Sequence, residues 1–150
     1  MHLKDIEKKS IQKEFLENGL LVRPVLERKS LLWIKDHYEK IVKIELKRLK
    51  KKIPKKFDYF NDIHKLIKLS ELNNFRLKTF LEINKNPEFK KHYYKVAKSY
   101  LDCLVGDELA MQKKINLSIQ CPNDTSSTLP IHADTWDGDS PFELVVWLPL

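Results

Sequence analysis

Cysteine is scarce in this chain of 150 residues, which contains only Cys103 and Cys121. The two lie eighteen residues apart, and neither belongs to a Cys-x-x-Cys pair. Such sparse and widely spaced cysteines argue against both a zinc knuckle and a disulfide framework. We therefore expect two buried, reduced thiols without a chemical role.

Long hydrophobic runs are also absent. The longest apolar stretches, LLVRPVL and FELVVWLPL, fall well short of the roughly 20 residues that a helix needs to cross a bilayer. The first residues, MHLKDIEKK, have no apolar segment of the kind that a secretory signal requires. The length is that of one ordinary domain. These features predict a cytoplasmic protein of a single domain without a membrane span.

Arginine is rare: the chain has 24 lysines and 4 arginines. The charges are also unevenly distributed along the sequence. Residues 1–100 carry 26 Lys or Arg against 13 Asp or Glu, whereas residues 101–150 carry 2 against 8. A basic region can indicate a nucleic-acid or anionic membrane surface. Binding surfaces usually favour Arg for bidentate phosphate contacts. We therefore favour solvated helix faces, and we do not expect nucleic-acid binding.

The run RLKKKIPKK at residues 48–56 has the form of a nuclear-localisation or nucleic-acid patch. Lysines at a helix C-terminus also complement the helix macrodipole, and a proline just beyond is an ordinary stop signal. We favour this second interpretation for the run.

Apolar residues recur at three- and four-residue steps through much of the first 106 residues, which predicts helices. Gly19 suits the end of the first helix, Pro54 the end of the second, and Gly106 the end of the last. Asn86 followed by Pro87 has the form of a cap and a first helical proline. The predicted helices cover residues 5–18, 27–52, 71–83 with Ser70 as cap, and 86–104.

After residue 107 the hydrophobic period changes from helical to alternating. Met111, Ile115, Leu117 and Ile119 share one parity, and polar residues share the other. The pattern predicts a strand with one apolar face and one amide-rich face. That amide-rich face either lines a polar cavity or is the wet side of an antiparallel sheet. Two shorter strands are predicted near residues 130–134 and 142–148, separated by the turn DTWDGDSP.

His132 and Asp134 form a His-x-Asp pair on the strand predicted near residues 130–134. Residues i and i+2 of a strand point to the same side, so one imidazole nitrogen and one carboxylate oxygen could bind a single divalent metal. With a third ligand they would make the facial triad that holds non-haem Fe(II). The alternative is an exposed or structural histidine, because a His-x-Asp pair arises easily by chance.

The blocks LVGDELAMQ, INLSIQ, LPIHAD, GDSPFE and VVWLPL, all within residues 104–150, give this segment a resemblance to a known family. It resembles the Fe(II)/2-oxoglutarate oxygenases found in bacterial carbohydrate gene clusters, including those similar to a streptomycin-biosynthesis protein. These enzymes are distant relatives of phytanoyl-CoA dioxygenase.

The resemblance implies a role for six residues. His132 and Asp134 would be the first two iron ligands. The candidates for contacting 2-oxoglutarate or the substrate are Gln112, Asn116 and Gln120, and Trp147 would form a wall of the cavity. The resemblance also implies a small-molecule substrate such as a sugar or nucleotide sugar, and an α+β fold. In that fold residues 1–106 are mainly helical and residues 107–150 begin an incomplete double-stranded β-helix, or jelly roll.

Two features of the family are missing from the chain. The distal His ligand and the basic residue that holds 2-oxoglutarate both belong to a later part of the jelly roll. His37, His64 and His92 lie on predicted helices and are poor substitutes for the missing ligand. We therefore expect the N-terminal part of a dioxygenase that is inactive as this chain.

Two further hypotheses belong to other classes. The chain could be a non-catalytic, lysine-rich binding module for an anionic partner. It could also be a fragment without a function, in which case the apolar terminal run predicts aggregation.

Overall fold

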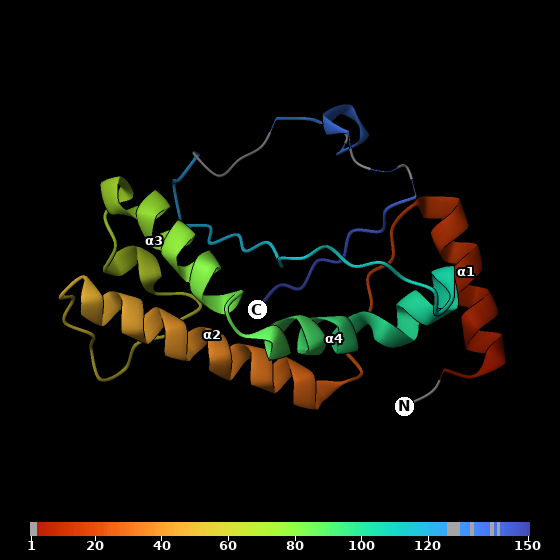
Figure 1. The fold of residues 1–150 in the computed structure, drawn as a ribbon, viewed down its shortest axis with the longest axis horizontal. Coiled ribbons are helices and arrows are strands. Elements are labelled where there is room, and N and C mark those ends of the chain that lie inside the picture. The colour runs from red at the N-terminus through yellow and green to blue at the C-terminus, as the bar shows by residue number, and fades with distance from the viewer. Residues whose placement is uncertain (1–2, 126–129, 133, 139, 141) are drawn as a thin grey trace.

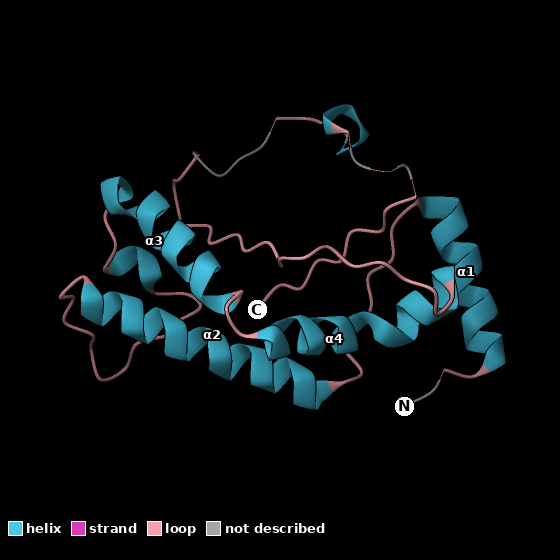
Figure 2. Cartoon of the chain, in the orientation of Figure 1, coloured by secondary structure: helices cyan, strands magenta, loops and turns pink. Residues whose placement is uncertain are grey.

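The computed structural model describes residues 3–125, 130–132, 134–138, 140 and 142–150, and within them the regular structure is helical (Figures 1 and 2). The four predicted helices are confirmed, but the second ends at Arg48 and not at residue 52 before Pro54 as predicted. The α-helices are α1 (Asp5–Asn18), α2 (Arg28–Arg48), α3 (Leu69–Ile83) and α4 (Pro87–Val105), and two short 3-10 helices cover Ile63–Lys65 (η1) and Asp134–Asp137 (η2).

Local signals account for most of the helix ends. Gly19 follows α1 in the left-handed conformation, with φ of 65°, and its N–H donates to the Phe15 carbonyl at 2.8 Å. The Asn86 side chain accepts from the Glu88 N–H at 3.0 Å, as an N-cap does. The cap predicted at Ser70 is wrong. α3 begins at Leu69, two residues before the predicted start, after the N-cap residue Lys68.

The helices pack around α2, which contacts both α3 and α4, while α1 lies against α4 (Figure 1). The spacing of apolar residues on α2 explains this position, because Ile34, Tyr38 and Ile41 are all buried. None of the described helices is long and apolar enough to cross a membrane.

The core has two clusters that share α2. In the first, Tyr38, Val42 and Leu46 of α2 pack with Leu72 and Phe75 of α3. The second joins α2 to α4 and to the end of α3, and its buried members are Ile34, Ile41, Ile83, Phe89, Val96 and Ile115.

The expected α+β fold is wrong for the described residues, because none of them forms a strand, and no part of a jelly roll is present among them. Residues 107–125 and 142–150 run as extended segments against the helices (Figure 2). The predicted alternation is nevertheless visible in the burial. Ile115 and Ile119 are buried, whereas the polar residues between them are exposed. Alternation indicates which side chains face a core, but a strand also needs a neighbouring strand to pair with.

Side chains of the helices take the place of that neighbouring strand. The Asn84 carboxamide donates to the Ile115 carbonyl at 3.0 Å and accepts from the Ile115 N–H at 2.8 Å. Arg76 Nε donates to the Ile119 carbonyl at 2.7 Å, and the Tyr93 hydroxyl donates to the Val146 carbonyl at 2.6 Å. Buried backbone groups must find partners, and these side chains provide them.

Replacing Asn84 with Ala should lower the free energy of unfolding by about 1–3 kcal/mol, because it leaves both backbone groups of Ile115 without their partner. Urea denaturation measures the change. Asn74→Ala is the matched control, since Asn74 is an exposed residue of the same helix. Equal stabilities of the two variants would show that the Asn84 contacts are dispensable.

At the interface between α2 and α4, an indole ring lies between two imidazole rings. Trp33 stacks on His37 at 4.7 Å and on His92 at 4.2 Å between ring centroids. His37 Nε2 is buried and has no hydrogen-bond partner among the described residues. Burial lowers the pKa of His37, Lys40 lowers it further, and Asp36 opposes the shift.

This lowered pKa makes stability depend on pH. The unfolded chain protonates His37 near its ordinary pKa of about 6.5, while the folded chain resists protonation. Stability should therefore be complete above that value and fall as the pH drops through it toward the lower pKa of the folded state. Thermal melting at pH 7.5 and 5.5 measures the loss. His37→Gln should reduce the loss, and His64→Gln, at an exposed position, should leave it unchanged.

Candidate functional site

The polar face of the extended segment carries the three amides that the sequence assigns to cofactor or substrate binding. Gln112, Asn116 and Gln120 are all exposed, and none makes a hydrogen bond with another described residue. The backbone next to these amides is held at Ile115 by Asn84 and at Ile119 by Arg76. The described residues do not gather these three amides around one cavity, and they form no antiparallel sheet of which the amides could be the solvated face.

An ion pair holds the extended segment just after the amide row, which is Gln112, Asn116 and Gln120. Arg76 contacts both the Ile119 carbonyl and the Asp124 carboxylate, with 2.5 Å between Nη2 and Oδ2. The Asp124 side chain is only 4% exposed, so the pair is nearly dry. It ties α3 to the point where the chain leaves the helical body.

His132 has a ring orientation that suits metal binding. Its Nδ1 lies 2.7 Å from the Pro130 carbonyl oxygen, and a carbonyl can only accept, so Nδ1 carries the hydrogen. The neutral ring therefore has its lone pair on Nε2. Metal-binding histidines commonly donate their second ring N–H to a carbonyl in this way. The side chain of His132 is exposed.

The local structure around the motif differs from the expected strand. Residues 130–132 are not a strand, and Asp134 is the first residue of η2. The argument that positions i and i+2 of a strand face the same side therefore does not apply to His132 and Asp134. The Asp134 side chain lies outside the described part of the structure, and so does the whole of Ala133 between them.

The described residues 130–132 and 134–138, which include η2, lie away from the helices (Figure 1), and we call this part of the chain the arch. η2 lies on this arch, well separated from the extended segment that carries the amide row. The structure therefore does not bring the two halves of the expected site together.

The other described histidines, His37, His64 and His92, lie in the helical part of the molecule. His37 and His92 stack on Trp33, and His92 Nδ1 lies 3.1 Å from the Ser30 hydroxyl. His64 belongs to η1. Among the described residues, no three His, Cys, Asp or Glu side chains are grouped closely enough to hold a metal.

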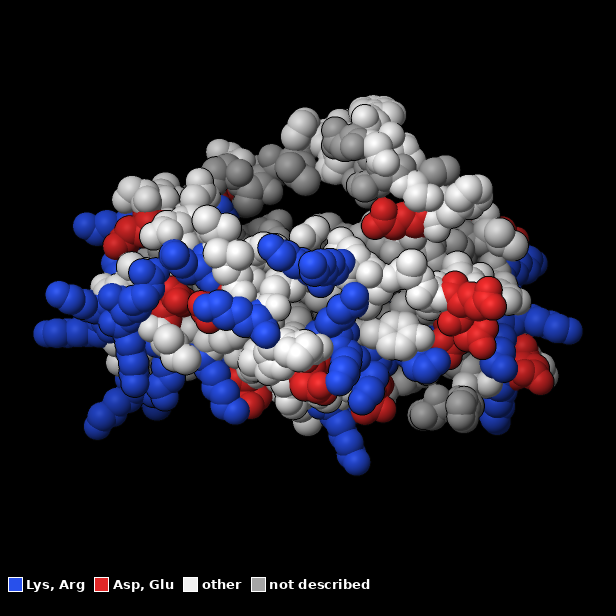
Figure 3. All heavy atoms as spheres, in the orientation of Figure 1, with Lys and Arg blue, Asp and Glu red and all other residues white. Residues whose placement is uncertain are grey.

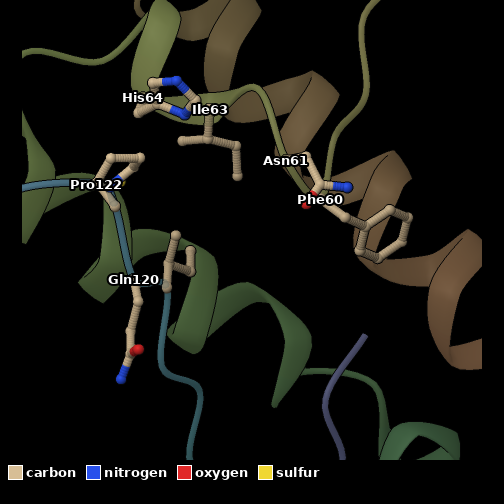
Figure 4. Close-up of a pocket in the computed structure, with 8 residues that line it drawn as sticks. Phe60, Asn61, Ile63, His64, Gln120 and Pro122 are labelled. Atoms are coloured by element: carbon tan, nitrogen blue, oxygen red, sulfur yellow. The ribbon is translucent and has the colours of Figure 1, made fainter.

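A pocket of about 320 Å³ lies between the loop that precedes α3 and residues 119–122. Of the expected site residues it includes only Gln120, and Figure 4 shows the Gln120 amide directed away from His64 and Asn61. Burial raises the pKa of the neighbouring Cys121 thiol, with Asp124 adding to the shift and Arg76 opposing it. A raised pKa disfavours the reactive thiolate, and Cys121 is only partly buried, whereas the sequence predicts a buried thiol.

Trp147 is 80% exposed and walls no cavity among the described residues. Its neighbour Leu148 packs against the second cluster, so this extended segment turns alternate side chains inward and outward. Several large exposed apolar side chains lie in the described part of the last twenty residues: Ile131, Trp136, Phe142, Val145, Trp147 and Leu150. Where exposed apolar side chains lie next to one another, they form an interaction site or promote aggregation.

Comparison with protein families, with curated proteins and with solved structures gives no match for this chain.

Sequence reasoning missed the residues that position the extended segments. Arg76 and Tyr93 belong to helices and Asn84 is the C-cap residue of α3, and each contacts a residue more than thirty positions away. Each occupies a helix face or end in an ordinary way, so no pattern of spacing could have distinguished them.

The exposed apolar surface predicts self-association. Replacing Val145 with Thr and Trp147 with Ser should reduce the binding of a hydrophobic dye and delay sedimentation of aggregates, with little change in melting temperature, because both side chains are exposed. Leu148→Ala is the contrasting variant. Since Leu148 packs against the core, it should lower the melting temperature. Unchanged dye binding in the double variant would contradict the assignment of this surface.

Proposed function

We propose that this chain is part of a non-haem Fe(II)/2-oxoglutarate-dependent oxygenase that acts on a sugar or nucleotide sugar. His132 and Asp134 supply two of the iron ligands in this proposal. The proposal rests on the ordered sequence blocks of residues 104–150 and on the His132 ring. The observation that carries it is the Nδ1 contact with Pro130, which places the lone pair of the neutral ring on Nε2.

The described residues fit iron only in part. His132 has a suitable nitrogen, but the side chain of Asp134 lies outside the described residues, and no third ligand is grouped with them. Iron held by one imidazole and one carboxylate has open positions, at which it would supply the oxidising chemistry with 2-oxoglutarate and O₂. The role of this chain is to present His132 from the arch, with the ring fixed by the Pro130 carbonyl.

The exposed apolar side chains support the same proposal. The hydrophobic shell around a metal site controls the access of solvent to the metal. Trp136 lies beside the motif and is 74% exposed. In the proposed oxygenase, a further polypeptide segment covers this surface, adds the third ligand and holds 2-oxoglutarate.

The chain alone should bind a divalent metal weakly and consume no 2-oxoglutarate. Titration with Co²⁺, followed by calorimetry and by the metal's absorption spectrum, measures binding without requiring turnover. His132→Gln and Asp134→Asn should each weaken the affinity at least tenfold, because a two-ligand site loses half of its donors.

The matched controls are His64→Gln and Asp107→Asn, which change an exposed His and an exposed Asp outside the motif. Both should bind Co²⁺ as the parent chain does. Equal weakening by motif and control variants would refute the assignment of His132 and Asp134. Turnover of 2-oxoglutarate by the 150-residue chain would refute the claim that the site is incomplete.

A further inference from the structure

A dense group of basic side chains lies where α2 ends. Residues 47–56 contain seven Lys or Arg and no Asp or Glu. Arg48 pairs with Glu45, and Lys51 pairs with Glu71, at 2.8 and 2.7 Å. The remaining five are exposed and make no ion pair with a described residue. We call these five the lysine cluster: Lys47, Lys50, Lys52, Lys55 and Lys56. Figure 3 shows blue side chains projecting together from this end of the molecule.

The helix macrodipole does not account for the lysine cluster. Its effect is confined to the last turn of a helix, and α2 ends at Arg48. Only Lys47 of the cluster therefore belongs to the helix. The other four lie beyond it, where each adds repulsion to its neighbours and gains no compensating contact within the described structure.

One member of the cluster has a costly backbone conformation. The Lys51 N–H donates to the Leu46 carbonyl at 2.9 Å, and the Lys50 N–H donates to the Lys47 carbonyl at 2.9 Å. This pair of bonds is a Schellman motif, whose left-handed residue is usually glycine. Here that residue is Lys50, with φ of 55°, whereas α1 has Gly19 in the left-handed position that follows it. A lysine at a position that suits glycine indicates a use for its ammonium group.

We propose that the lysine cluster binds the surface of a membrane that contains anionic phospholipids. Groups of roughly four to eight basic residues are attracted to such surfaces, and the attraction needs only point charges, which lysine provides. Ile44, one turn before Lys47 on α2, is 61% exposed and adds an apolar side chain beside the cluster.

The surroundings of the cluster favour a lipid surface over a nucleic acid. Binding of single strands uses exposed aromatic rings on which bases stack. The aromatic residues that follow the cluster, Phe57, Tyr59 and Phe60, are instead partly buried against the first core cluster. Arginine, which reads phosphates and bases bidentately, contributes only Arg48, and Arg48 is paired with Glu45.

Co-sedimentation with vesicles of phosphatidylcholine, with and without phosphatidylserine, tests the proposal. The protein should bind only the anionic vesicles, and raised salt should release it. Replacing Lys47, Lys52, Lys55 and Lys56 with Gln should lower the partition coefficient by roughly two to three orders of magnitude, at about fivefold for each lysine. The matched control changes Lys9, Lys29, Lys78 and Lys95 to Gln. These four are also exposed and make no ion pair with a described residue.

Lys50→Gly separates binding from folding. The variant should melt at a higher temperature, because glycine adopts a positive φ without strain. It should also partition roughly fivefold less onto anionic vesicles. A higher melting temperature with unchanged partitioning would show that Lys50 has no part in binding. Ile44→Ser should weaken binding to vesicles at every salt concentration, because it removes an apolar contact.

Three results would overturn the proposal. The first is no difference between neutral and anionic vesicles. The second is equal loss of binding in the cluster variant and the matched control, which would indicate net charge alone. The third is retention of an RNA or DNA oligonucleotide at a salt concentration that releases the vesicles, with sensitivity to the cluster variant but not to Ile44→Ser. All of these readouts are independent of Co²⁺ binding, so they stand apart from the proposed oxygenase site.

Discussion

The buried face of α2 is the constraint on which the rest of the structure depends. Its side chains contribute to both core clusters, with Val42 and Leu46 packed toward α3 and with Ile34 and Ile41 packed toward α4. The extended segment spans the same two clusters, since Ile119 belongs to the first and Ile115 to the second. Burial of these apolar groups is the main favourable contribution to folding, and α2 is the element that connects them. Loss of its packing would therefore release the extended segment as well as α3 and α4.

Polar side chains hold the extended segments in place by hydrogen bonds to their backbone, in addition to the apolar contacts of the core. An extended chain laid on helices has backbone N–H and carbonyl groups that no neighbouring strand satisfies. Asn84, Arg76 and Tyr93 reach across from α3 and α4 to pair with some of these groups. Their positions explain why the inward side chains of the segment are held in place while the amide face remains open to solvent. The same arrangement leaves Val145 and Trp147 exposed, because no described residue covers the outer side of the terminal segment.

The two proposed activities occupy different parts of the molecule. The His-x-Asp motif lies on the arch, whereas the lysine cluster follows α2 in the helical body (Figure 1). The first depends on a ring nitrogen directed by the Pro130 carbonyl, and the second on the attraction of the lysine ammonium groups to anionic lipids. If both hold, the helical layer places the protein on an anionic surface while the arch remains available for its metal and for the polypeptide that completes the site.

The sequence by itself determined the four helices, because three- and four-residue spacing, Gly19 and the Asn86–Pro87 pair act over a few residues. It also determined which side chains of residues 111–120 turn inward, since alternation is a local property. Only the tertiary structure decided that these residues form no strand, that the amide face is open, and that His132 lies apart from it. Strand pairing and site assembly depend on contacts between distant residues such as Asn84 and Ile115. Periodicity predicts the face that a residue occupies, but it contains no information about the partner that the face will meet.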